Sequence, residues 1–288
     1  MDEKWFYTVV TRTNCKVLTS IGLDPVDYYA HHKNYIGKEM YIVVTAFVLN
    51  DNDICKGGKA IPIACVRVGR MKKAARDSYK RVYKEDGSYT YPKNAEGLLR
   101  RKGEEYFAGV ELTGSKEGTE KDPKMSLLKV YQDTIVPALE EKVVGRLNEG
   151  GERQVVIVKQ EDGAGLHQDG TYVSTMKKVF AEKEWLLFNQ PSQSPVTNVH
   201  DACIFPMMSK AVSSNQAMVY GSQLLKGEEL NKTVMQVFDD KAHLPTIARV
   251  FTWHSQIVCS ILEHDGDNDY LSKRGGVHFW GATGVHDG

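Results

Sequence analysis

The segment QVVIVKQEDGAGLH (Gln154–His167) begins as a run of apolar, β-forming residues and ends abruptly in acidic and glycine residues. A buried strand here would carry Asp162 to its carboxyl end, where open α/β sheets place their ligand sites. A second apolar run, Trp185–Phe188, leads through the segment NQPSQSPVTNVH (Asn189–His200) to Asp201 at the expected start of a helix. Two acids brought together in this way are the ligands that a hard divalent cation needs.

Upstream of this segment, three apolar runs predict an antiparallel meander of three strands. The first ten residues are rich in β-formers, and Met40–Leu49 is the most continuous apolar run, expected at the centre of the sheet. Ile61–Val68 is the expected third strand, with Pro62 at its start or at a sheet edge.

The remaining regular pattern is helical. Apolar residues recur every four positions between Leu127 and Val143, which predicts an amphipathic helix over Met125–Leu147. Further helices are predicted at about 171–183, 201–217, 230–238 and 244–261, and Pro245 suits the first turn of the last one. Three strands followed by helix, strand, helix, strand and more helices predict a mixed α/β chain.

Composition excludes several classes of protein. The chain of 288 residues has no apolar run that approaches the ~20 residues of a membrane helix, so no membrane partner is expected. Met1 is followed at once by charged residues, and no secretory signal peptide is expected. The five cysteines form no CxxC pair, which favours a reducing compartment inside the cell.

Charge is unevenly distributed along the chain. The formal net charge is zero, which argues mildly against a protein whose whole surface binds DNA, yet Arg70–Tyr106 contains eleven Lys/Arg and six Asp/Glu. This stretch belongs to an expected basic insertion at about 70–124. It is either a merely solvated insertion or a DNA-contacting loop. In the second case the phosphate-neutralising residues would include Lys72, Lys73, Arg76, Arg100, Arg101 and Lys102.

Three ordered motifs resemble those of mariner-like transposases of the plant-type branch, which are DDE/DDD superfamily endonucleases. They are DEKWFY (Asp2–Tyr7), QEDGAGLH (Gln160–His167) and QPSQSPVTN (Gln190–Asn198), with 38 residues between Asp162 and Asp201. The resemblance implies an RNase H-like fold over residues 1–270: a mixed sheet, made of the antiparallel meander plus parallel strands, flanked by helices. The glycine-rich residues 271–288 are expected to form a flexible tail.

The resemblance also implies a chemistry. Asp2, Asp162 and Asp201 would hold two Mg²⁺ or Mn²⁺ ions for cleavage and strand transfer of double-stranded DNA, at transposon ends and target, in the nucleus. A homodimer is a further expectation. His167 matches a histidine of the second motif and is a possible DNA contact. Three clustered carboxylates repel one another, so at least one pKa should be raised.

Some features depart from the family pattern and keep alternatives open. Gly165 and Leu166 replace a Pro-Pro pair, and Val196 replaces an aspartate. Helix-turn-helix modules precede the first acid in the family, whereas only Met1 precedes it here, so a truncated or repurposed copy is expected. The alternatives are a catalytically inactive, transposase-derived module that binds DNA or protein, and an RNase H-like hydrolase of another phosphodiester.

Each acid also has an ordinary structural reading. An aspartate before a glycine commonly forms a turn, as Asp162 would, and Asp201 could simply be an acid in the first turn of a helix. Glu161 is expected on the face of its strand opposite to the site.

Overall fold

The computed structural model describes residues 1–7, 38–49, 58–79, 82–83, 88–95, 97–145, 157–162, 164–190, 198–220, 227–240 and 244–263. The predicted tail, residues 271–288, and residues 191–197 of the third motif lie outside the described residues. Among the described helices, none is long and apolar enough to cross a membrane.

The antiparallel meander is confirmed. Strand β1 (Asp2–Tyr7) and strand β3 (Gly58–Arg67) pair with opposite sides of the central strand β2 (Lys38–Leu49). Pro62 lies opposite Thr45, next to a shift in the register between β2 and β3. Proline cannot donate a ladder hydrogen bond, which is why it is tolerated at such an irregularity.

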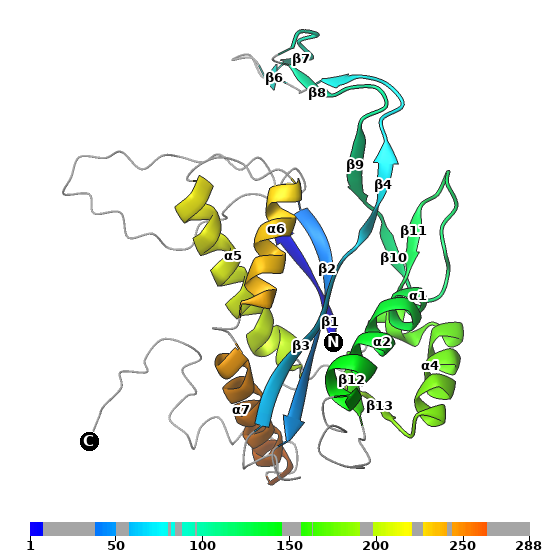
Figure 1. Ribbon diagram of the computed structural model, residues 1–288, viewed down its shortest axis with the longest axis vertical. Helices are drawn as coiled ribbons and strands as arrows, with labels where there is room; N and C mark the ends of the chain where they lie inside the picture. The colour runs from blue at the N-terminus through cyan, green and yellow to red at the C-terminus, as the bar shows by residue number, and fades with distance from the viewer. Residues whose placement is uncertain are drawn as a thin grey trace, which may run out of the picture.

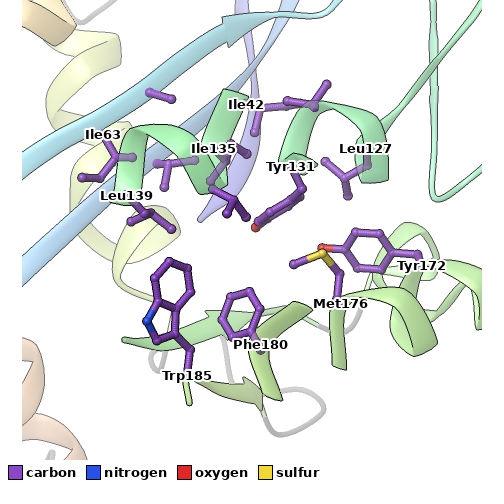
Figure 2. Packing of buried hydrophobic residues seen from close by; sticks show 14 of the residues in the cluster. Ile42, Ile63, Leu127, Tyr131, Ile135, Leu139, Tyr172, Met176, Phe180 and Trp185 are labelled. Carbon is purple, nitrogen blue, oxygen red and sulfur yellow. The ribbon is translucent and has the colours of Figure 1, made fainter. Parts of the chain in front are cut away.

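Side chains alternate between the two faces of this sheet, so the strands supply two separate cores. On one face, residues such as Ile42 and Ile63 pack against a long helix and α4 (Gly170–Glu182). On the other face, Tyr41 and Val43 pack against the C-terminal helices. Figure 1 shows the helices on both sides of the strands, and Figure 2 shows the first of the two cores at close range.

The long helix of the first core is one continuous helical stretch with π-helical turns. Its parts are α1 (Leu127–Val130), η4 (Tyr131–Ile135), α2 (Val136–Leu139) and η5 (Glu140–Gly145). The Ser126 hydroxyl accepts a hydrogen bond from the Lys129 amide and caps its start. The four-residue spacing of apolar residues predicted this helix because each of those residues is buried against the sheet.

The predicted strand after residue 154 is β12 (Val158–Glu161), and it pairs in parallel with β13 (Leu186–Asn189). Between them lie the short helix η6 (Gly165–Gln168) and α4. Among the described residues, β12 and β13 form a two-stranded sheet of their own and are not hydrogen-bonded to the meander. The chain is therefore mixed α/β, with antiparallel and parallel sheets.

The C-terminal helices follow the predicted order. They are η8 (His200–Ile204), α5 (Phe205–Tyr220), α6 (Gly227–Asp239) and α7 (Leu244–Glu263). Apolar residues of α5, α6 and α7, such as Met208, Val234 and Val250, complete the second core.

The basic insertion contains regular strands that its sequence pattern does not predict. Three antiparallel pairs follow one another along a narrow ribbon: β4 (Gly69–Lys73) with β9 (Glu105–Gly109), β5 (Ser78–Tyr79) with β8 (Leu98–Arg100), and β6 (Val82–Tyr83) with β7 (Tyr89–Thr90). The described residues between 69 and 109, here called the arm, project from the rest of the molecule (Figure 1). A ribbon without a buried face needs no alternation of apolar residues, so periodicity could not reveal it. Strands β10 (Glu111–Thr113) and β11 (Lys124–Ser126) lead from the arm back to α1.

Candidate functional site

The candidate site begins with Asp2, the first residue of β1, which is only 5% exposed. One of its carboxylate oxygens accepts a hydrogen bond from the amide of Glu3 at 2.6 Å. The other accepts one from the side-chain amide of Asn198 at 2.7 Å. The N-terminal strand is thereby joined directly to the segment that carries Asp201.

Asn198 caps the helix in which Asp201 lies. Its Oδ1 accepts hydrogen bonds from the backbone amides of His200 at 3.0 Å and Asp201 at 3.4 Å. Because Oδ1 is engaged in this way, Nδ2 faces Asp2 and lies 3.3 Å from Oδ2 of Asp201. Both carboxylates contact the same nitrogen, so Asn198 holds two of the three predicted acids together.

Asp162 lies just beyond the end of β12 and is held by His167. Its Oδ1 accepts a hydrogen bond from Nδ1 of His167 at 2.6 Å and another from the Ala164 amide at 3.1 Å. The other imidazole nitrogen of His167 lies 3.3 Å from a carboxylate oxygen of Glu3. The buried imidazole therefore joins Asp162 to the residue that follows Asp2.

The opposite charges of Asp162 and His167 stabilise each other. The hydrogen bond from His167 lowers the pKa of Asp162. Burial alone would lower the pKa of His167, but its hydrogen bonds to Asp162 and Glu3 raise the pKa to about 10. His167 is consequently an imidazolium at neutral pH, with both N–H groups directed at carboxylates.

The pKa of Asp2 is shifted in the opposite direction to that of Asp162. Burial raises its pKa to about 6, the hydrogen bond from Asn198 opposes the rise, and the negative charges of Asp201 and Asp162 add to it. A raised pKa in the acid cluster was predicted from mutual repulsion, although burial contributes more than repulsion. Asp2, Asp162 and Asp201 therefore share one electrostatic environment.

A buried polar network lies beneath Asp162. The ammonium group of Lys159 donates to the Glu161 carboxylate and, at 2.8 Å, to the hydroxyl of Tyr172, which in turn donates to Glu161. The same ammonium lies 3.6 Å from the centre of the Tyr131 ring. Glu161 is 1% exposed, which confirms that it points into the core while the next residue, Asp162, lies at the site.

The structure separates the predicted site residues into two groups. Asp2 and Asp201 both contact Asn198, and Asp162 contacts His167, whose other ring nitrogen lies near Glu3. The predicted phosphate-binding residues belong instead to the arm; they are Lys72, Lys73, Arg76, Arg100, Arg101 and Lys102. Sequence reasoning missed Asn198 and Glu3. An asparagine just before an apolar helical pattern is a recognised capping signal, and this signal could have identified Asn198.

The raised pKa of Asp2 predicts how stability should change with pH. Between the ordinary pKa of 3.8 and the folded-state pKa of about 6, the folded chain binds more protons than the unfolded chain. Stability should therefore fall as pH rises through this window, by up to about 3 kcal/mol, and stay lower above it. Asp2→Asn should remove this loss.

The measurement is the melting temperature of Asp2→Asn and of the unchanged chain from pH 4 to pH 7. The difference should be smallest near pH 4 and largest above pH 6. Asp133→Asn, at an exposed position in η4, is the control and should give a small difference that varies little with pH. A difference for Asp2→Asn that is equally independent of pH would contradict the prediction.

The three predicted acids therefore come from β1, the end of β12 and the start of η8. The Asn198 amide contacts Asp2 and Asp201, and the His167 imidazolium contacts Asp162. Within the described parts of the chain, no group of three or more His, Cys, Asp or Glu side chains is arranged closely enough to count as a ready metal site. Comparison with family models, with curated proteins and with solved structures found no match for this chain.

Proposed function

We propose that this chain is a metal-dependent DNA strand-cleavage and strand-transfer domain of the mariner-like, DDE/DDD transposase type. Asp2, Asp162 and Asp201 would be its metal ligands. The observation that carries the proposal is the pair of hydrogen bonds from Asn198, which join two acids 199 positions apart in the sequence. An antiparallel meander followed by a parallel strand pair, with helices on both sides, is also what an RNase H-like fold would contain.

The donor atoms suit a hard divalent cation such as Mg²⁺ or Mn²⁺. All three proposed ligands are carboxylates, and burial together with neighbouring negative charge raises the pKa of Asp2, which a bound cation would relieve. The Asn198 amide and the His167 imidazolium already contact these carboxylates. Metal binding would compete with these contacts.

Two divalent ions bound by these acids would supply the Lewis acidity for phosphodiester cleavage and transesterification. The surrounding residues would orient the metal-binding carboxylates. Asn198 would orient Asp2 and Asp201 from the helix start, and His167 would orient Asp162 from η6. The Lys159–Glu161 pair would hold the strand that delivers Asp162.

The proposal includes the substrate and the setting. Double-stranded DNA would be the substrate at both transposon ends and target, a homodimer would bring two ends together, and the reaction would take place in the nucleus.

The test is a nicking assay on supercoiled plasmid DNA with the full chain. Mg²⁺ or Mn²⁺ should allow conversion of supercoiled to nicked DNA, and EDTA should prevent it. Calorimetric titration with Mn²⁺ alone should detect binding. A chain that binds neither metal nor cleaves DNA, while still binding DNA, would instead be an interaction module.

A further inference from the structure

The arm differs from the rest of the molecule in its charge and its exposure. The whole chain has a formal net charge of zero, whereas Arg70–Tyr106 has five more basic than acidic residues. The ribbon projects away from the helices that cover the meander (Figure 1), and all of its described residues except Gly97 are exposed or half-buried. A local positive charge on a projecting element is suited to a negatively charged partner.

The described acidic side chains of the arm are occupied within the arm. Asp77 accepts a hydrogen bond from the backbone amide of Lys102 at 2.7 Å, and Glu104 accepts one from the backbone amide of Arg101 at 2.9 Å. Glu105 pairs with Lys73 at 3.4 Å. These contacts stabilise the arm at the bend between the β4–β9 and β5–β8 pairs.

Four basic side chains of the arm are available to bind a negatively charged partner. Across the part of the arm that the structure describes, Lys72, Arg76, Arg101 and Lys102 form no ion pair with a described carboxylate. Lys72 lies opposite Tyr106 in the ribbon, and the guanidinium of Arg100 stacks on that same Tyr106 ring at 3.9 Å. Positive charges therefore gather at the bend between the β4–β9 and β5–β8 pairs.

We infer that this bend binds the phosphate backbone of double-stranded DNA. Duplex DNA presents one negative charge about every 1.7 Å along its axis. Such a repeated charge suits several neighbouring cations that form no ion pair with a described carboxylate better than a single small anion would. A two-stranded ribbon is also narrow enough to enter the major groove. The inference rests on the proposed function in one respect: the DNA held by the arm is taken to be the DNA cleaved at the carboxylate site.

The test measures DNA binding without cleavage. A fluorescent DNA duplex is titrated with the full chain carrying Asp162→Asn, in EDTA, over a range of salt concentrations. Adding Lys72→Gln, Arg101→Gln and Lys102→Gln should raise Kd at least tenfold at 0.1 M salt. It should also lower the slope of log K against log salt by about 3, one for each lost phosphate contact.

The matched control removes the same charge elsewhere, through Lys177→Gln, Lys178→Gln and Lys232→Gln at exposed positions of α4 and α6. Its Kd and slope should stay close to those of the Asp162→Asn chain. An unchanged slope in the arm variant, or an equal loss in the control, would overturn the inference.

Three other outcomes separate the remaining possibilities. Tighter binding of an RNA duplex of the same length would overturn the assignment to DNA. A change of oligomeric state in the arm variant, measured by light scattering, with DNA binding unchanged would instead assign the arm to contact between two copies of the chain. Arm-dependent DNA binding by a chain that never nicks DNA would contradict the proposed function and support this inference.

Discussion

Asp201→Asn is expected to reduce metal-dependent nicking of DNA by about 1,000-fold or more. A bound metal ion contributes several kcal/mol of transition-state stabilisation, and about 4 kcal/mol corresponds to that factor. Asp201 is exposed, and the contact from Asn198 Nδ2 at 3.3 Å is long. An asparagine there should leave the melting temperature nearly unchanged, so the loss of activity would not come from unfolding.

The Asp162→Asn and Asp2→Asn variants should lose nicking activity to the same extent as Asp201→Asn. Their effects on the stability of the folded chain should have opposite signs. Asp162→Asn removes the charge that pairs with the His167 imidazolium, and should destabilise the chain by about 1–2 kcal/mol. Asp2→Asn removes a buried carboxylate with a raised pKa, and should stabilise the chain above pH 6. One shared catalytic loss with three different stability effects would be hard to produce by any general disruption of the fold.

The measurements are plasmid nicking rates in Mn²⁺ and melting temperatures with and without Mn²⁺ at pH 7. Mn²⁺ should raise the melting temperature of the unchanged chain, because it would bind only the folded state, and this rise should shrink in all three variants. Asp133→Asn should behave like the unchanged chain. Nicking within tenfold of the unchanged rate in any of the three variants would remove that residue from the proposed ligand set.

The sequence predicts the parts of the fold that have a strong internal pattern. Met40–Leu49 is almost continuously apolar because β2 is central and covered on both faces, and the helix over Leu127–Gly145 repeats its buried residues every four positions. The arm has no such pattern, because its short strands are stabilised by pairing across a ribbon that is exposed on both sides. Its composition could suggest only an irregular, charged insertion.

Only part of the candidate site could be predicted from the sequence. The three motifs predict Asp2, Asp162 and Asp201 as site residues, and their role as metal ligands stays a prediction, although the charges of Asp201 and Asp162 act on Asp2. The contacts between them were not predictable, since Asn198 reaches Asp2 and His167 reaches Glu3 only after β1, β12 and η8 have been brought together. Sequence spacing contains no direct information on which polar groups meet across such distances.

Removing one partner of the buried Lys159–Glu161 pair should strongly destabilise the folded chain. The two side chains are 7% and 1% exposed, so either charge left alone would be buried without its counter-ion. Lys159→Met or Glu161→Leu alone should lower the free energy of unfolding by about 3–5 kcal/mol. The double variant should lose less than the sum of the two, since it leaves no unpaired charge.

The pKa of Lys159 gives this prediction a second readout. Burial lowers the pKa to about 8, and the charge of Glu161 opposes the shift. Lys159 thus releases its proton more readily in the folded chain than in the unfolded chain, so its own contribution to stability should rise as pH increases from about 8 toward 10. The raised pKa of His167 lowers stability over the same window, so the contribution of Lys159 is measured as the difference between the unchanged chain and Lys159→Met. Lys159→Met should remove this rise, whereas Glu161→Leu should move it to lower pH because the opposing charge is gone.

The measurement is a double-mutant cycle from urea denaturation at pH 7, followed by the same series at pH 9. The coupling between Lys159 and Glu161 should be about 2–4 kcal/mol. The matched control is the exposed pair Lys73 and Glu105, 3.4 Å apart in the arm, whose coupling should stay below about 1 kcal/mol. Equal coupling in the two cycles would mean that the network under Asp162 is no more than a solvent-screened ion pair. The position of Asp162 would then have to depend on His167 and the Ala164 amide alone.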